Sequence, residues 1–193
     1  MEKYDILIVG VGGQGTILTG KVLGELALDC GLDIKMAETH GMAQRGGSVV
    51  THVRLGERVL SPLIPLGAAD YLLSFEELET IRWITYLRRG GTAIYFNKTL
   101  PPASVISGRN NYPEKINEDL TTIDGTVIPV AEEGSIAQDN PRVLNIYLLG
   151  VLAGLLAFPV DSWLKALKKS IPHPFLKMNQ EAFMAGWKRQ RNN

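Results

Sequence analysis

Six residues near the N-terminus, Gly10-Val11-Gly12-Gly13-Gln14-Gly15, constrain the fold more than any other part of the sequence. They follow a short apolar run over residues 4–9, which predicts a strand, and precede apolar residues at helical spacing up to Gly31, which predicts a helix ending there. Glycines at a strand-to-helix turn permit a tight bend and the close approach of a ligand's phosphates, and the first N–H groups of the helix favour an anion. The run therefore predicts an α/β fold that begins with an anion-binding turn.

The next segments predict a sheet with one unusual insertion. Residues 32–37 form a second predicted strand, which ends at Glu38 and should pair in parallel with the first through a right-handed crossover. Residues 48–55 and 58–60 are β-prone runs joined by the two-residue loop Gly56-Glu57, which predicts a β-hairpin. A simple alternating α/β chain would not contain such a hairpin.

The rest of the chain predicts further strands and a helical C-terminus. Strands are expected over residues 69–75, 92–96 and 126–130. Between them, one helix should end at Gly90-Gly91 and a short helix should lie near residues 114–120. Three C-terminal helices are expected over about residues 142–158, 161–170 and 174–189, the second of them capped by Asp161. The expected fold is a single α/β domain over residues 1–193, with a Rossmann-like, largely parallel sheet, a β-hairpin insertion and C-terminal helices.

Composition excludes several classes of protein. Twenty basic residues balance 20 acidic ones, which argues against nucleic-acid binding. The single cysteine, Cys30, cannot form an intrachain disulfide or hold an iron–sulfur cluster, and its place before Gly31 on an apolar face predicts a packed thiol. The N-terminus lacks a signal-peptide pattern, and the uncharged stretch between Arg142 and Asp161 is interrupted by glycine and proline, which favours a buried helix over a membrane span. A cytoplasmic protein without membrane association is expected.

Charge is unevenly distributed along the chain. Residues 162–193 hold seven basic residues and one acidic residue, a formal charge of +6, which leaves −6 on residues 1–161. Solvated helix faces explain this distribution, and a docking surface for an acidic partner is the alternative.

Polar residues that could contact a ligand follow the second predicted strand. Glu38 lies 23 residues beyond Gly15, where a dinucleotide-binding fold places its ribose-binding acid. The connection after it carries His40, Gln44, Arg45 and Ser48, and Gly46-Gly47 could expose backbone donors to an anion. In the alternative interpretation these groups satisfy one another. His52 and His173 have no second ligand at metal spacing, so both are expected to be structural and no metal site is predicted.

The glycine run, residues 38–50 and the segment Ser61-Pro62-Leu63-Ile64-Pro65 together carry a family resemblance. The chain resembles the gamma-type component of the 2-oxoacid:ferredoxin oxidoreductases, and within that family its indolepyruvate branch. The likeness extends through residues 69–76 and 140–150 and covers nearly the whole chain.

The resemblance implies a subunit of a thiamine-diphosphate enzyme that oxidatively decarboxylates a 2-oxoacid, reduces ferredoxin and leaves an acyl group on coenzyme A. The indolepyruvate branch implies arylpyruvate substrates; pyruvate, ketoisovalerate and 2-oxoglutarate enzymes have related components. Thiamine diphosphate and the iron–sulfur clusters would belong to a large catalytic partner in a hetero-oligomer, with no cofactor held tightly by this chain alone. Coenzyme A is the ligand suggested for the glycine loop.

Three hypotheses therefore stand. The first is the accessory subunit, in which the 12–15 run and Arg45, Gly46 and Gly47 form an anion-binding lip that faces the partner's active site. The second is an independent nicotinamide-dependent oxidoreductase that uses Glu38 on the ribose. The third is a scaffold subunit whose glycine loop is only a tight turn.

Overall fold

The computed structural model describes residues 3–40, 47–101, 105, 108, 111–113, 116, 120, 122–131 and 140–192. Gln44, Arg45 and Gly46 of the predicted site, and most of the helix predicted near 114–120, lie outside these residues. The described residues form a six-stranded sheet in the order β2-β3-β1-β4-β5-β6. The strands are β1 (Tyr4–Val11), β2 (Asp33–His40), β3 (Ser48–Gly56), β4 (Ala69–Ser74), β5 (Leu87–Phe96) and β6 (Gly125–Val130).

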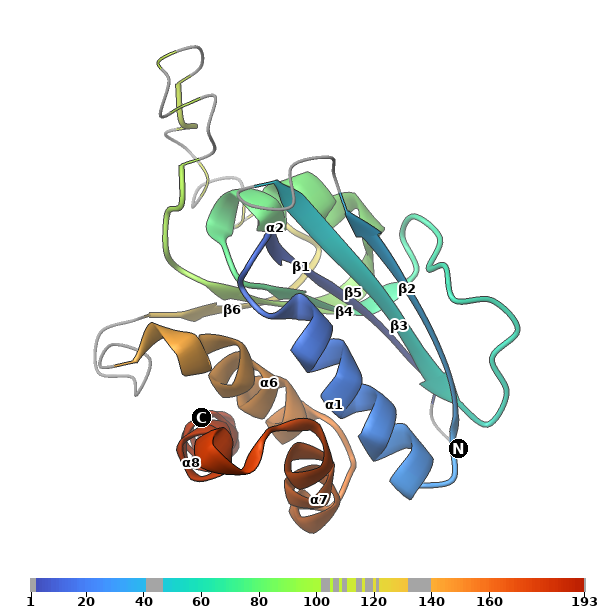
Figure 1. Ribbon diagram of the computed structural model, residues 1–193. Helices are drawn as coiled ribbons and strands as arrows, with labels where there is room; N and C mark the ends of the chain where they lie inside the picture. The colour runs from blue at the N-terminus through green and yellow to red at the C-terminus, as the bar shows by residue number, and fades with distance from the viewer. Residues whose placement is uncertain are drawn as a thin grey trace.

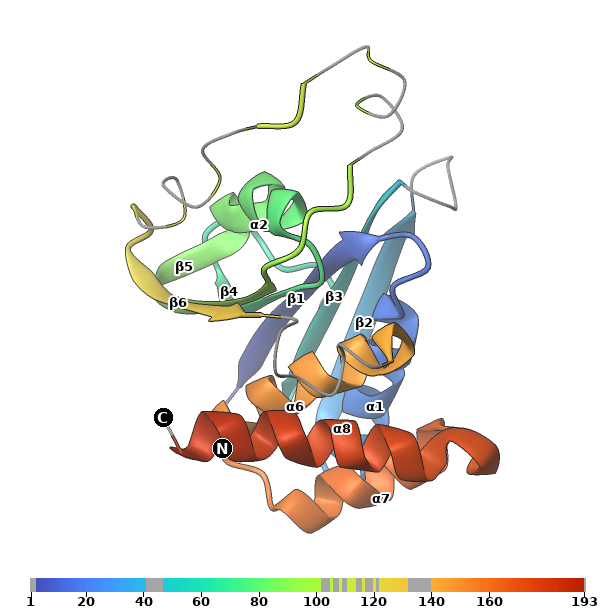
Figure 2. The ribbon, with the colours of Figure 1, turned by 90° about the vertical axis from the view of Figure 1, so that its left-hand side faces the viewer.

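Helices cover both faces of this sheet (Figures 1 and 2). On one face lie α1 (Thr16–Asp29) and α6 (Leu144–Leu155), with η2 (Pro141–Val143) leading into α6. A further layer, α7 (Val160–Ser170) and α8 (His173–Asn192), packs outside α1 and α6. The opposite face carries α2 (Glu77–Trp83) and the short η1 (Ile84–Tyr86).

The predicted α/β fold with a largely parallel sheet is confirmed, but two predictions about the first strands are wrong. β1 and β2 run in the same direction without pairing, because β3 lies between them and is antiparallel to both. The hairpin is formed by β2 and β3, and residues 57–60 are not a strand. β1 then pairs in parallel with β4, as do β4 with β5 and β5 with β6. Of the strands that the described residues form, only β3 is reversed.

The sequence predicts a helix that ends at Gly90-Gly91, but this glycine pair lies inside strand β5. The helix ends at Trp83, η1 follows, and β5 already begins at Leu87. Gly90 has a φ of +67° and donates its N–H to Asp124 O (2.8 Å), where the register between β4 and β5 shifts. The pair therefore permits an irregularity inside a strand, a role that glycine also has in sheets.

Other predicted elements and ends are confirmed. Gly31 ends α1 in the left-handed region, with Gly31 N bonded to Leu28 O (3.2 Å) and Leu32 N to Ala27 O (2.9 Å), the two bonds of a Schellman motif. Cys30 is a free, partly buried thiol packed against the core. The three C-terminal helices form, but Asp161 lies in the first turn of α7 after Pro159 and makes no cap.

Helix α6 is the predicted buried helix of the C-terminal region. Every residue from Asn145 to Ala153 is buried, between the sheet on one side and α8 on the other. None of the helices within the described residues combines the length and apolar character that a bilayer crossing requires.

Helices α6 and α8 touch at their backbones. A Cβ atom added to Gly150 of α6 would overlap the carbonyl oxygen of Phe183, and one added to Gly186 of α8 would overlap that of Tyr147. One turn further along, a Cβ on Gly154 would come within 2.7 Å of Gln190 Cβ. The glycines thus allow an approach closer than the usual 8–10 Å between helix axes.

Gly150→Ala should lower the free energy of unfolding by about 2 kcal/mol or more, because the two helices must separate to admit one methyl group. Gly24→Ala in α1 is the matched control, since its Cβ would meet Met36 Cε at an ordinary 3.7 Å. This control should raise the free energy of unfolding by up to about 1 kcal/mol through helix propensity. Denaturant unfolding measures both, and equal stabilities for the two variants would contradict the backbone contact.

Candidate functional site

The glycine loop, residues 10–15, lies at the carboxyl end of β1 and leads into α1. Gly13 and Gly15 have φ values of +102° and +87°, a backbone conformation that glycine adopts without strain. A Cβ on Gly10 would come within 2.8 Å of Gln14 Oε1 and 3.3 Å of Phe75 Cβ. The sequence motif therefore reflects both conformation and close packing.

The side chain of Gln14 braces this loop from within. Its Oε1 accepts a hydrogen bond from Val11 N (2.6 Å), and its Nε2 donates to Phe75 O (2.9 Å) in the connection between β4 and α2. Phe75 N in turn donates to Val9 O (3.0 Å). Both polar atoms of Gln14 are thus engaged by the protein, so Gln14 shapes the loop.

Asn145 of α6 holds the last residue of the glycine loop, Gly15. Its Nδ2 donates to Gly15 O (3.2 Å), which also accepts from Thr19 Oγ1 and Thr19 N (both 3.1 Å). A Cβ on Gly15 would collide with the Asn145 amide. Sequence reasoning missed this contact, although a single asparagine in an otherwise apolar helix was a usable signal because buried polar groups require partners.

Some backbone donors of the loop face no acceptor among the described residues. Val11 N bonds to Gln14 Oε1, Gly12 N to Gly47 O (2.9 Å), and Gln14 N to Val11 O (3.1 Å). Within the described part of the chain, the N–H groups of Gly13 and Gly15 have no hydrogen-bond acceptor. Together with the positive end of the α1 dipole they form the part of the loop suited to an anion.

The bond from Gly12 to Gly47 joins the two segments that sequence analysis singled out. Gly47 and Ser48 end the connection that begins after His40, and Arg45 is two residues before Gly47 in the sequence. The structure therefore brings Gly47, the end of the second loop, against the glycine loop.

Ser48 is held by a buried cluster on α2. Its Oγ donates to Glu79 Oε2 and accepts from Trp83 Nε1 (3.2 Å), and Arg82 Nη1 contacts Glu79 Oε1 at 2.8 Å. The Glu79 residue is 2% exposed. Ser48 is therefore fixed by neighbours that the sequence did not predict.

Two more buried carboxylates, Glu76 and Glu77, stand at the start of α2. Glu76 caps the helix by accepting from Glu79 N (2.9 Å), and also accepts from Leu100 N (3.1 Å) and Tyr112 Oη (2.6 Å). Glu77 accepts from Thr99 Oγ1. Burial and the hydrogen bond to Glu76 raise the pKa of Tyr112, so it stays a neutral donor. The positive end of α2 favours these anions.

Glu38 lies further from the glycine loop than in a dinucleotide-binding fold. It is an exposed residue of β2, and β3 separates β2 from β1. In the dinucleotide-binding order the second strand lies directly beside the first, whereas here it is displaced by a further strand spacing of about 4.8 Å. His40 ends the same strand opposite Val49.

His52 is structural in character, as expected from the sequence. It is 6% exposed, and its Nδ1 accepts a hydrogen bond from Ile64 N (3.2 Å). Burial and the nearby Arg54 lower its pKa, which keeps the ring neutral and able to accept this bond. No group of His, Cys, Asp and Glu residues in the described part of the chain could hold a metal ion.

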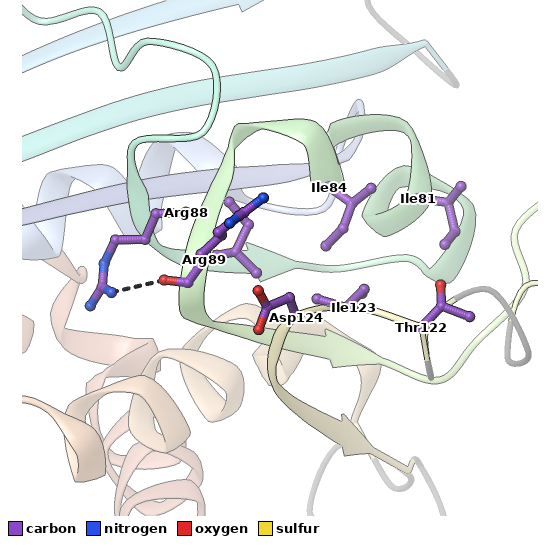
Figure 3. Close-up of a pocket in the computed structure, with 8 residues that line it drawn as sticks. Ile81, Ile84, Arg88, Arg89, Thr122, Ile123 and Asp124 are labelled. Carbon is purple, nitrogen blue, oxygen red and sulfur yellow. Dashed lines mark hydrogen bonds between the residues drawn. The ribbon is translucent and has the colours of Figure 1, made fainter.

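A separate recess of about 380 Å³ lies between α2–η1 and the start of β6 (Figure 3). Its apolar side is formed by Ile81, Ile84 and Ile123, and Arg88 bonds to Arg89 O (3.1 Å) beside it. Arg88 also pairs with Asp70 (Nε to Oδ1, 2.7 Å). None of the predicted site residues lines this recess.

Known proteins share the fold and sequence along nearly the whole chain. The family model described as pyruvate ferredoxin/flavodoxin oxidoreductase matches residues 5–189. The indolepyruvate oxidoreductase subunit IorB of Pyrococcus horikoshii is 34% identical, over 97% of this chain and 96% of that protein. The 2-oxoglutarate synthase subunit KorC of Methanothermobacter marburgensis is 28% identical, over 95% of each.

Two solved structures share the fold at lower identity. A keto/oxoacid ferredoxin oxidoreductase gamma subunit from Geobacter sulfurreducens has a TM-score of 0.70 at 22% identity, over 98% of this chain and 99% of that one. A 2-oxoglutarate:ferredoxin oxidoreductase from Magnetococcus marinus, with 2-oxoglutarate, coenzyme A and succinyl-CoA bound, has a TM-score of 0.74 at 18% identity. That match covers 100% of this chain and 32% of the longer chain.

Gln14→Leu should lower the free energy of unfolding by about 1–3 kcal/mol, because it leaves Val11 N and Phe75 O without partners in a packed loop. Gln180→Leu on α8 is the control; the described residues give its side chain no hydrogen bond, and its effect should stay within about 0.5 kcal/mol. Chemical unfolding followed by circular dichroism compares the two. A loss no larger for Gln14→Leu than for Gln180→Leu would contradict the bracing role.

Proposed function

The chain belongs to the pyruvate ferredoxin/flavodoxin oxidoreductase family, and on that premise we propose that it is one subunit of a 2-oxoacid:ferredoxin oxidoreductase of the indolepyruvate type. Sequence identity supports this substrate class. The chain is 34% identical to the indolepyruvate subunit and 28% identical to the 2-oxoglutarate subunit, over nearly equal lengths. The substrates would be arylpyruvates and the product an aryl-acetyl-coenzyme A.

In this proposal the redox chemistry belongs to a partner subunit. The chain has one cysteine, whereas an iron–sulfur cluster takes four protein ligands, commonly cysteines. Thiamine diphosphate, which supports decarboxylation of the 2-oxoacid, and the clusters that pass electrons to ferredoxin would both be held by the large subunit. This chain would contribute binding groups at the edge of that active site.

Those binding groups are the N–H donors of the glycine loop and the guanidinium of Arg45. Gly13 and Gly15 offer N–H groups with no acceptor among the described residues, at the positive end of α1. The bond from Gly12 N to Gly47 O places Gly47, two residues after Arg45 in the sequence, against the same loop. A pyrophosphate such as that of coenzyme A is recognised by this combination of backbone donors and a guanidinium. The Magnetococcus enzyme of the same fold was solved with coenzyme A bound.

The arrangement is less suited to an independent nicotinamide-dependent enzyme. Such an enzyme needs an acid at the end of the strand beside β1 to bind the ribose, and that neighbouring strand here is the reversed β3. NADH binding by the isolated chain is therefore the measurement that tests this alternative.

The subunit proposal is tested by co-expressing the chain with the large thiamine-binding subunit of the same organism. The complex should reduce ferredoxin with arylpyruvates and coenzyme A, with kcat/KM at least about tenfold above that for pyruvate or 2-oxoglutarate. The isolated chain should be inactive and should not bind NADH. A preference for 2-oxoglutarate would refute the indolepyruvate assignment, and NADH-linked activity of the isolated chain would refute the subunit proposal.

Arg45→Ala should raise the KM for coenzyme A of this complex about tenfold or more, with kcat at saturating coenzyme A little changed, because a charge-assisted hydrogen bond is lost. Arg89→Ala is the matched control, since Arg89 is exposed near the start of β5, at the end of the parallel strands away from the glycine loop. Steady-state kinetics with varied coenzyme A separates the two. An unchanged KM would exclude the anion-binding lip, and impaired assembly with unchanged kinetics would favour a scaffold.

A further inference from the structure

The connection between β3 and β4, residues 57–68, presents three leucines to solvent; we call it the leucine loop. Leu60, Leu63 and Leu66 are 82%, 57% and 68% exposed. Large apolar side chains clustered on one short segment commonly mark an interaction site, whereas scattered ones need no explanation. In Figure 1 the loop extends outward from the end of β3, at the right of the view.

The leucine loop is held firmly despite its lack of helix or strand. Val59 and Ile64 point inward and are 4% and 2% exposed, with Ile64 packed in the core on the α2 face. Val59 N donates to Asp33 Oδ2 (2.9 Å), and Ile64 N donates to His52 Nδ1 (3.2 Å). Gly67 N donates to Thr85 O (2.9 Å) and closes the loop against η1.

Arg54 forms the central contact beneath the loop. Its Nη1 donates to Ser61 O (3.2 Å) and Leu63 O (2.9 Å), on either side of Pro62. The same guanidinium binds Asp5 through Nε (2.8 Å) and Nη2 (3.1 Å), and the Arg54 side chain is only 14% exposed. A largely buried ion pair inside the sheet is thus used to fix two carbonyl groups of a surface loop.

This combination resembles a preformed binding element. A flexible loop could fold its leucines inward, but here the inward positions are occupied by Val59 and Ile64. Since the backbone is already ordered, docking would cost little conformational entropy. The exposed leucines would then be buried only when a partner covers them.

We propose that the leucine loop is a docking element that inserts Leu60, Leu63 and Leu66 into an apolar groove of the large catalytic subunit. This inference rests on the proposed function, which makes the chain a subunit of a heteromer. In the Magnetococcus structure the same fold occupies 32% of a longer chain, so this fold occurs covalently joined to further protein.

The proposed heteromer makes the large subunit the occupant, and a second copy of this chain is the alternative that the test distinguishes. A leucine side chain offers on the order of 100 Å² of apolar surface, so three supply far less than the ~800 Å² per partner of a stable interface. The contact must therefore extend beyond the loop. Asp33 links the loop to β2, the outer strand of the described sheet, and a large partner could cover both.

The test compares two sets of substitutions in the chain co-expressed with its large subunit. One variant carries Leu60→Ser, Leu63→Ser and Leu66→Ser. The control carries Leu28→Ser and Phe175→Ser, two exposed apolar residues on α1 and α8 that are 65% and 53% exposed. Because all five side chains are exposed, both variants should keep the circular dichroism spectrum of the wild-type chain.

The leucine-loop variant should bind the large subunit at least a hundredfold more weakly than the wild-type chain, and the control within threefold of it. Binding of the purified chain to the immobilised large subunit gives both values, and light scattering gives the oligomeric state of the chain alone. Wild-type affinity in the leucine-loop variant would overturn the proposal. So would a wild-type dimer of this chain that only the leucine-loop variant dissociates, since the occupant would then be a second copy.

The proposed function and the docking role of the leucine loop can fail separately. If the wild-type chain neither binds nor activates the large subunit, the proposed function fails and the docking element fails with it. If the wild-type complex is active and the leucine-loop variant assembles equally well, only the docking element is refuted.

Discussion

The backbone contact between α6 and α8 is the constraint on which the arrangement of the helices and the glycine loop depends. Gly150 and Gly186 leave no space for a side chain between the two helices, so α6 is fixed between α8 and the sheet. The N-terminal end of α6 carries Asn145, whose amide reaches Gly15 O at the start of α1. A contact between two helices, made at Gly150 only five residues along α6 from Asn145, therefore determines where one wall of that loop lies.

The reversed strand β3 separates this protein from a dinucleotide-binding fold that starts in the same way. Its insertion moves Glu38 one strand away from β1 and places the beginning of β3 directly beside the glycine loop. Gly47 and Ser48 then occupy the position beside the loop that a parallel second strand would have occupied. Ser48 is held there by Glu79 and Trp83 of α2, on one face of the sheet, while Asn145 of α6 holds Gly15 from the other face. The local motif is shared with nucleotide-binding proteins, while the surroundings of the motif are not.

The features that sequence predicted well are those decided by neighbours in the chain. Gly31 ends α1 because the bonds of its motif join residues within a few positions of it, and the spacing of apolar residues places the C-terminal helices. The glycine loop was also found, since a strand, glycines and a helix follow one another directly. The family resemblance added the partner and the reaction class, which no spacing of residues could supply.

The features that sequence did not predict depend on contacts distant along the chain. Whether β3 pairs with β1, with β2 or with residues 58–60 is decided by the whole sheet, and a two-residue Gly56-Glu57 link is a local signal that the sheet overrides. Glu76, Glu77 and Glu79 look like an exposed acidic helix start in the sequence, but hydrogen bonds from Ser48, Thr99 and Tyr112 allow them to be buried. Gln14 looked like a ligand contact, and its two bonds within the protein give it a bracing role.

The two surfaces proposed to meet the partner lie at opposite ends of the sheet. The glycine loop follows the carboxyl end of β1, whereas the leucine loop joins the far end of β3 to the start of β4. β1 has eight residues, so at about 3.3 Å per residue the two ends are separated by roughly 25 Å. A partner that buries the leucines and also presents its active site to the glycine loop must therefore extend along the full length of the sheet.

The basic residues of α7 and α8 lie on the outermost helical layer. Lys169 among them is already paired with Asp29 of α1 (3.4 Å). This pairing favours solvated helix faces over a docking surface for an acidic partner.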